Sequence, residues 1–185
     1  CLSNTYGSVA EALRHSSFTA ASIMSTSGFV TVNYETWPLV THVLLLILMF
    51  IGGSAGSTAG GLKVSRLIIL SKSAKLSAQK MLSPRSVKSV RLEGKTVDEA
   101  TIHNIQRYFV LYAFIVLVSI ILVSIDSATT GPYGFMTSVS SVMACFNNVG
   151  PGFAGVGPVS NYAGLGIFTK IILTLDMLIG RLEIM

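Results

Sequence analysis

Charged side chains are scarce in this chain: Asp, Glu, Lys and Arg make up 11% of its 185 residues, whereas 51% are hydrophobic. A soluble globular domain carries about a quarter charged residues, so the composition excludes an ordinary soluble domain and predicts a membrane protein. The run of residues 108–125 contains no charged side chain. About twenty apolar residues cross a bilayer as a helix, so we expect this run to span.

Cysteine is nearly absent, with only Cys1 and Cys145 in the chain. The two form no CxxC pair, no zinc-ligand spacing and no disulfide framework. The three histidines, His15, His42 and His103, are scattered over different segments, and no Ser/His/Asp or Cys/His arrangement can be drawn from the sequence. We therefore predict no enzymatic activity and no cofactor.

The basic residues are unevenly distributed. Ten of the thirteen lie between Lys63 and Arg107, together with three acidic residues. We expect residues 71–106 to be a basic loop, which the positive-inside rule places in the cytoplasm. Base-stacking aromatic residues are absent from this loop. Nucleic acid is therefore not expected as a partner.

The lengths of the apolar segments in the second half predict a re-entrant path. With the basic loop inside, residues 108–125 run outward and residues 162–180 return. Between them, residues 135–146 are apolar but too short to span, and the turn-rich sequence NNVGPG follows at 147–152. Backbone that enters the membrane and turns back is tolerated where it lines a water-filled cavity. This pattern predicts a pore helix followed by a filter loop.

The first half repeats the pattern. Residues 8–25 are compatible with a helix, a short loop follows at 26–29, and residues 39–51 form an apolar run. The sequence MFIGG at 49–53 also resembles MLIGR at 177–181. Internal duplication builds many transport folds, so we expect a unit of span, pore helix, filter strand and span.

A glycine tract, GGSAGSTAGG at residues 52–61, follows the apolar run of the first half. The uncharged residues 37–51 before it cover about 22 Å as a helix, short of the roughly 30 Å hydrocarbon core. We therefore expect the tract to lie inside the membrane, with residues 62–70 completing the crossing. Its glycines are Gly52, Gly53, Gly56, Gly60 and Gly61. A helix broken in this way is a candidate gate, because glycine adopts conformations that a helix forbids.

The glycine tract has two other interpretations. A phosphate-binding loop would need a lysine after Gly61, where Leu62 stands, and a preceding strand, which is not predicted. Close helix packing through small residues needs no gate and stays open as an alternative.

Glycine also centres the two short loops, as Gly28 and Gly150. A filter strips water from a cation by presenting several carbonyl oxygens, and glycine lets the backbone turn these oxygens inward. An ordinary external loop is the alternative for either sequence alone. A glycine-centred loop at the same place in both halves favours the filter over an ordinary external loop.

Three ionisable residues lie in the last span: Lys170, Asp176 and Arg181. Charges within a membrane normally face a cavity or a partner. We expect Lys170 to place its charge in the pore cavity, with a partner different from that of Asp176. Arg181 aligns with Gly53, so we predict that it hydrogen-bonds to carbonyl groups of the glycine tract and holds the pore closed. An arginine that reaches the cytoplasmic interface is the alternative.

Together these motifs resemble the Trk/Ktr/HKT superfamily of potassium transporters, and within it the TrkH-like membrane subunits. The motifs are STSGF at 25–29, WP at 37–38, FIGGSAGSTAGGLK at 50–63, FNNVGPG at 146–152 and LDMLIGRLEI at 175–184. The resemblance implies an all-α integral membrane fold with four pseudo-repeated units around one pore, two of them present here. Residues 1–70 would be the third unit without its first span, residues 71–106 a connection, and residues 107–185 a truncated fourth unit. A chain that begins with Cys1 rather than Met is accordingly expected to be a C-terminal fragment.

The resemblance assigns roles to individual residues. The filter oxygens, which would bind K⁺ through backbone carbonyls only, would come from Thr26, Ser27, Gly28, Asn148, Val149 and Gly150. Ser27 stands where the family more often has threonine. Residues 52–61 would be an intramembrane gating loop, and Arg181 its partner.

The resemblance implies potassium uptake across the cell inner (plasma) membrane, with the potassium ion as substrate. Its expected partners are membrane lipid, the missing repeats of the same chain, a second copy in a homodimer and a cytosolic nucleotide-binding regulatory subunit that docks on residues 71–106. A secondary transporter that binds a solute or sodium at mid-membrane is the alternative, and it would not need duplicated filter loops. A purely structural membrane subunit would not explain the charges in the last span.

Overall fold

The computed structural model describes residues 6–54, 56–57, 60–82, 90–92, 95–125 and 134–182. Its α-helices are α1 (Val9–Met24), α2 (Leu39–Phe50), α3 (Val64–Leu82), α4 (Glu99–Ile125), α5 (Gly134–Phe146) and α6 (Ile167–Leu182). Short 3-10 turns occupy Tyr34–Thr36 (η2), Ala154–Val156 (η4) and Tyr162–Gly164 (η5). The expected helical architecture is confirmed.

One small hairpin departs from the all-α expectation. Strands β1 (Arg91–Leu92) and β2 (Lys95–Thr96) pair antiparallel, with Arg91 opposite Thr96. Beyond them, the backbone N–H of Val97 donates to the carbonyl oxygen of Val90 at 2.9 Å. Only two residues separate the strands, and two-residue connections are the commonest in tight hairpins.

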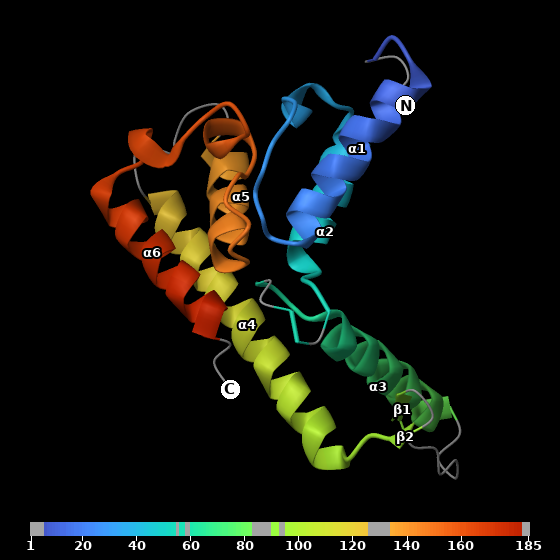
Figure 1. Ribbon diagram of the computed structural model, residues 1–185. Helices are drawn as coiled ribbons and strands as arrows, with labels where there is room; N and C mark the ends of the chain where they lie inside the picture. The colour runs from blue at the N-terminus through green and yellow to red at the C-terminus, as the bar shows by residue number, and fades with distance from the viewer. Residues whose placement is uncertain are drawn as a thin grey trace.

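The helices form two groups that meet at a central helix, α5 (Figure 1). Helices α1 and α2 lie side by side, and α4, α5 and α6 pack against one another. Helix α5 also contacts α2, while α3 extends away from both groups and packs along one end of α4. The two halves of the sequence are thus joined through α5 and α2.

Two buried apolar clusters hold these groups together. The larger one lies among α4, α5 and α6 and includes Val123, Val142 and Leu173. The smaller one lies between α1 and α2, and it also contains Val149 and Phe153 from the segment after α5. The segment that follows α5 therefore belongs to the core of the first half, which fixes the two halves relative to each other.

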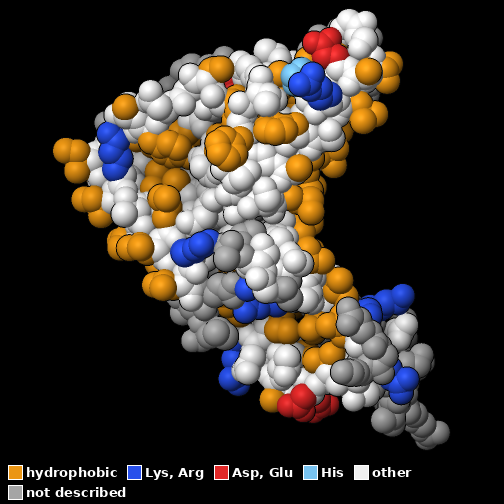
Figure 2. All heavy atoms as spheres, viewed as in Figure 1, with side chains coloured by type: hydrophobic (Ala, Val, Ile, Leu, Met, Phe, Trp, Pro, Cys, Tyr) orange, Lys and Arg blue, Asp and Glu red, His pale blue; other side chains and the backbone are white. Residues whose placement is uncertain are grey.

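The outer faces of the helices are apolar. Among the described residues, α4 is the helix long and apolar enough to cross a membrane, whereas α2 and α5 are apolar but shorter. The 27 residues of α4 cover about 40 Å, so the helix exceeds a hydrocarbon core of roughly 30 Å. Exposed apolar side chains cover the outer faces of α2, α4 and α6, and Figure 2 shows such side chains over much of the visible surface. An apolar exterior of this extent marks an interaction or membrane surface.

The structure changes three expected boundaries. Helix α3 continues to Leu82 instead of ending at residue 70, and α4 already begins at Glu99, so residues 71–106 are helical at both ends. The reason is compositional: residues 71–82 are mainly Lys, Ala, Leu, Gln, Met and Ser, without Gly or Pro. The last helix begins at Ile167 rather than 162, because residues 162–164 form a 3-10 turn capped by the Asn161 side chain.

The expected external turn at 126–134 lies outside the described residues except for its last position, where α5 begins.

Candidate functional site

The two glycine-centred loops leave their helices in the same way. After α1, the N–H of Ser27 donates to the carbonyl of Ser22 at 3.0 Å. After α5, the N–H of Val149 donates to the carbonyl of Ala144 at 2.8 Å, again five residues back. Both bonds are of the kind that closes a helix whose terminal residue turns left-handed. The local sequences thus end both helices with one motif.

The backbone angles repeat as well. Thr26 and Asn148 have φ angles of 54° and 55°, and the glycines two positions later, Gly28 and Gly150, have 72° and 105°. The residue between each pair has no positive φ. Glycine accepts this region freely, whereas a β-branched residue such as Thr26 does so at a cost of about 1–3 kcal/mol. Strained positions of this kind cluster at functional sites.

The two loops lie against each other. A side chain on Gly28 would collide with the carbonyl oxygen of Val149 and would lie 3.2 Å from Pro151. The absence of a side chain at Gly28 therefore allows the carbonyl of one loop to approach the backbone of the other. The structure brings together the predicted loop residues from positions more than a hundred residues apart in the sequence.

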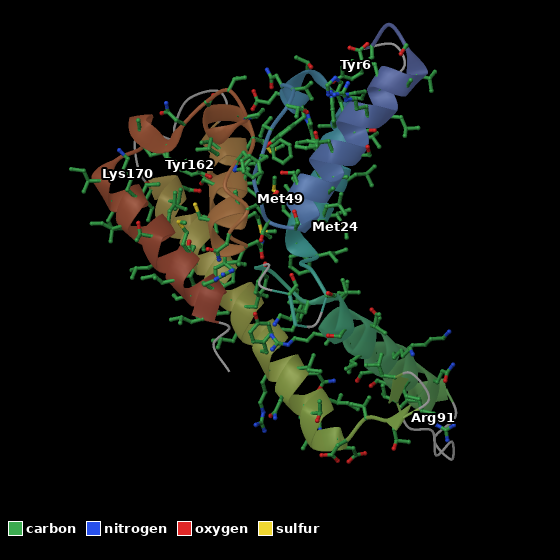
Figure 3. The ribbon with its side chains drawn as sticks, in the orientation of Figure 1. Tyr6, Met24, Met49, Arg91, Tyr162 and Lys170 are labelled. Carbon is green, nitrogen blue, oxygen red and sulfur yellow. The ribbon has the colours of Figure 1, made fainter. Side chains whose placement is uncertain are left out.

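Two tyrosines tether the second loop through its backbone carbonyl groups. The hydroxyl of Tyr34 donates to the carbonyl of Gly152 at 2.9 Å, and that of Tyr162 donates to the carbonyl of Gly150 at 2.6 Å. Burial is the main factor that raises the pKa of both phenols above the ordinary value, so both stay protonated donors. Figure 3 labels Tyr162 beside the upper part of α5, on the side of α6. Neither tyrosine was among the predicted site residues.

The start of the second loop is fixed by Asn147, which is fully buried. Its side-chain nitrogen donates to the carbonyl of Met143 at 2.9 Å, and its side-chain oxygen accepts from the Tyr112 hydroxyl at 2.9 Å. Helix α6 also reaches this point, because a side chain on Gly180 would collide with the carbonyl oxygen of Phe146. Asn147 was not among the predicted site residues, although it lies in the FNNVGPG motif.

Backbone hydrogen bonds join the two ends of the glycine tract. After α2 ends, the N–H of Gly52 donates to the carbonyl of Leu62 at 3.0 Å, and that of Leu62 donates to Phe50 at 3.2 Å. At the start of α3, the N–H of Val64 donates to the carbonyl of Gly53 at 3.3 Å. Helix α2 thus ends before the tract and α3 begins after it, and that the two are parts of one broken span stays a prediction.

The far side of the tract lies beneath both loops. The N–H of Gly60 donates to the Thr26 hydroxyl oxygen at 3.4 Å, and a side chain on Gly60 would collide with the carbonyl of Asn147. A side chain on Gly61 would lie 3.1 Å from the Asn147 amide oxygen, and the φ of Gly61 is 80°. Gly56 has a φ of 90° and open space around it. Gly60 of the tract thus lies against residues of both loops.

The charged residues of α6 have different surroundings. The ammonium of Lys170 donates to the carbonyl of Ala163 at 2.8 Å, close to the start of α6 (Figure 3). Asp176 is 2% exposed and accepts from the Ser119 hydroxyl at 2.7 Å. Lys170 and Asp176 have different partners, as expected. Arg181 is exposed in the last turn of α6. Its contact with the glycine tract stays a prediction. The position of Lys170 in a pore cavity also stays a prediction.

The electrostatics of the site favour cations. Helices α1 and α5 both end at the loops (Figure 1), and a helix C-terminus carries about half a negative elementary charge. Within the described ranges, no group of three or more His, Cys, Asp and Glu side chains is placed to hold a metal ion. A cation between the loops would therefore meet backbone carbonyl groups and helix dipoles rather than carboxylates.

Comparison with known proteins gave consistent matches. A family described as "TrkH: Cation transport protein" matches residues 5–185. The Trk system potassium uptake protein TrkH of Salmonella typhimurium is 36% identical over 98% of this chain, which covers 36% of that relative. The Trk system potassium uptake protein TrkG of Escherichia coli is 35% identical over 92% of this chain and 34% of the relative.

A solved structure agrees with the fold. The crystal structure of the potassium transporter TrkH from Vibrio parahaemolyticus superposes with a TM-score of 0.82 and 34% identity, covering 97% of this chain and 37% of that one. The chain therefore spans little more than a third of the length of the proteins that it matches.

Proposed function

The chain belongs to the TrkH family of cation transport proteins, and from this premise we propose that it takes part in potassium uptake across the cell membrane through a channel-like pore. Its two glycine-centred loops supply two strands of the selectivity filter. The relatives are named as potassium uptake proteins, which supports potassium as the substrate. Because the chain covers about a third of their length, the other strands come from segments outside these residues.

The observation that carries this proposal is the shared backbone of the two loops. In each loop, two residues with a positive φ flank one residue whose φ is not positive. The residues with a positive φ are Thr26 and Gly28 in the first loop and Asn148 and Gly150 in the second. Alternation of positive and negative φ allows successive carbonyl groups to turn toward one side, which residues restricted to negative φ do not permit as freely. Carbonyl oxygens arranged in this way replace the hydration shell of potassium.

The filter oxygens are those of Thr26, Ser27, Gly28, Asn148, Val149 and Gly150. The carbonyl of Gly150 already accepts from the Tyr162 hydroxyl. A carbonyl oxygen has two lone pairs, so this bond sets its direction and leaves capacity for an ion.

The glycine tract acts as the gate on the inner side of this filter. Gly60 lies against Thr26 and Asn147, so an ion that leaves the filter inward meets the tract first. Opening requires the tract to move aside, and its glycines permit that change. Helices α2 and α3 are two parts of one interrupted span, and Arg181 holds the closed tract from α6.

The remaining partners follow from the same proposal. The two halves are pseudo-repeated units, and further units of the same chain cover the exposed side of the first loop, where Phe29 is 72% exposed. A second copy forms a homodimer in the inner membrane. A cytosolic nucleotide-binding subunit docks on residues 71–106, which lie on the cytoplasmic side.

Ion flux tests this function against the alternative of a secondary transporter. The complete natural chain is reconstituted in proteoliposomes, and fluxes of potassium, rubidium and sodium are compared with and without a counter-ion on the opposite side. We expect potassium and rubidium to pass down their gradients, with sodium slower by about tenfold or more, as carbonyl coordination discriminates between these ions. Strictly coupled exchange, or equal sodium and potassium flux, would contradict the filter.

A further inference from the structure

The groove between α3 and α4 points to a second binding site, whose lining residues are distinct from those of the two loops. A hollow of about 540 Å³ lies between these helices and is lined by Arg66, Thr101, Asn104, Arg107, Tyr108 and Leu111, among others. We propose that this groove binds the headgroup phosphate of an anionic phospholipid from the adjoining leaflet. The proposal depends on the membrane location of the chain and not on the filter.

The depth of the groove matches the headgroup region. Helix α4 covers about 40 Å, longer than the roughly 30 Å hydrocarbon core, and its uncharged run starts at Tyr108. Arg107 directly precedes this run. Arg66 lies at the same level, since its guanidinium carbon is 4.5 Å from the centroid of the Tyr108 ring. Two guanidinium groups therefore share the boundary between apolar and polar surroundings.

The chemistry of the lining suits a phosphodiester. Guanidinium groups bind phosphate oxygens through paired N–H donors, and a guanidinium can stack on an aromatic ring while it donates in its own plane. Asn104 and Thr101 add neutral polar groups on the side away from the apolar run. The acidic residues Asp98 and Glu99 precede these positions on the chain and do not line the groove.

An apolar path continues from the groove along α4. A shallow, open surface on one face of α4 shares Arg107 and Leu111 with the groove; His103 and Gln106 line its polar end, and Val110 and Phe114 line its apolar end. The side chains of Val110 and Phe114 are 66% and 63% exposed. Basic residues at the polar end and apolar residues at the other are the arrangement that a phospholipid fits and a free phosphate does not use. The lipid acyl chain would follow this path.

Charge complementarity selects an anionic lipid over a neutral one. Ten of the thirteen basic residues lie between Lys63 and Arg107, with only three acidic residues among them. Each Lys or Arg near an anionic leaflet contributes about 1 kcal/mol of attraction, whereas a zwitterionic lipid offers no net charge. The expected ligand class is therefore a phospholipid with a net negative headgroup.

Native mass spectrometry of the complete natural chain tests the site, with phosphatidylglycerol and phosphatidylcholine offered in equal amounts. We expect the unaltered chain to retain phosphatidylglycerol preferentially, and the double variant R66Q/R107Q to lose that retention by about fivefold or more, since charge-assisted bonds are roughly twice as strong as neutral ones. The control R91Q removes a charge from strand β1, outside the groove, and should change retention by less than about twofold.

Three results would overturn the proposal: full retention in R66Q/R107Q, an equal loss in R91Q, or displacement of phosphatidylglycerol by inorganic phosphate at the same concentration. If the double variant does not fold, the single variant R107Q tests the proposal in its place. Arg107 is exposed, so its replacement should leave the fold intact. Phosphatidylglycerol should raise the Tm of the unaltered chain and not that of R107Q. Ion flux is recorded separately, so loss of lipid binding and failure of the filter are distinguishable.

Discussion

The two glycine-centred loops share a backbone pattern and have very different surroundings. In the second loop Asn147 is fully buried and Val149 is 3% exposed, whereas Phe29 of the first loop is 72% exposed. The second loop is held by side chains from η2, α4 and η5, through Tyr34, Tyr112 and Tyr162. The second loop therefore has neighbouring elements on both of its sides.

The first loop is held mainly by its own helix. The hydroxyl of Ser22 donates to the carbonyl of Phe29 at 2.7 Å and lies 3.2 Å from the hydroxyl of Ser27. The loop conformation is therefore encoded locally, by the helix end and the glycine, because two different environments leave it unchanged. Distant contacts then decide how firmly each loop is held.

The largest expected effect comes from the glycine where the loops meet. In G28A the added methyl group collides with the Val149 carbonyl, and the residue must keep a positive φ. We expect potassium flux to fall by about tenfold or more, since a misplacement of about 1 Å at a functional site can cost a hundredfold. Rubidium uptake into proteoliposomes measures the change.

The matched control for this variant is G164A. Gly164 lies in η5, has no positive φ and has nothing within 4 Å of an added methyl group. Its uptake should equal that of the unaltered chain. If G28A transported as well as G164A, the loops would not share one ion path.

The next effect concerns the contact that only the second loop has. In Y112F the fully buried Asn147 side-chain oxygen loses its hydroxyl donor, and an unsatisfied buried polar group costs about 1–3 kcal/mol. We expect a lower Tm for the complete chain. The control S124A also removes a hydroxyl from α4, but one that is exposed and bonded within its own helix, to Ile120. A Tm for Y112F equal to that of S124A would show that Asn147 does not depend on Tyr112.

A smaller effect is expected from the outer tether of the second loop. In Y162F the Gly150 carbonyl loses its 2.6 Å bond, while the aromatic ring is kept. A net hydrogen bond contributes about 1 kcal/mol, so we expect the preference for potassium over sodium to fall by about fivefold, with little change in Tm. Competition between the two ions in the flux assay measures this preference. An unchanged preference would mean that the orientation of Gly150 does not matter for selectivity.

The smallest effect is expected in the first loop. In S22A the carbonyl of Phe29 loses its donor, but this carbonyl is at the exposed end of the loop, where water can replace the bond. Selectivity should therefore change by less than about twofold. If S22A lost more of the preference for potassium over sodium than Y162F, the first loop and not the second would be the one whose hydrogen bonds matter more for selectivity.

The sequence alone predicted the local features of this site. Helix α1 begins one residue after Ser8, whose hydroxyl accepts from the N–H of Glu11 at 3.1 Å, and residues 8–25 had been expected to be helical. Helix α2 ends just before the glycine tract and α3 begins just after it, and both loops follow helices at the positions that their glycines indicated. These features depend on residues that are close in sequence.

Contacts between distant residues could not be predicted. Tyr34 and Gly152 are 118 positions apart, and Tyr112 and Asn147 are 35 apart. No spacing or periodicity links such pairs, because they depend on how the helices pack. The predicted site named the residues whose backbone shapes the loops and missed the side chains that hold them.

The most direct test of the shared filter is the anomalous scattering of rubidium in crystals of the complete natural chain. A peak should appear between the two loops, within direct coordination distance of the carbonyl oxygens of Ser27 and Val149 and on the outer side of Gly60. Rubidium bound elsewhere in the membrane region, with none between the loops, would contradict the proposal that these loops form one filter.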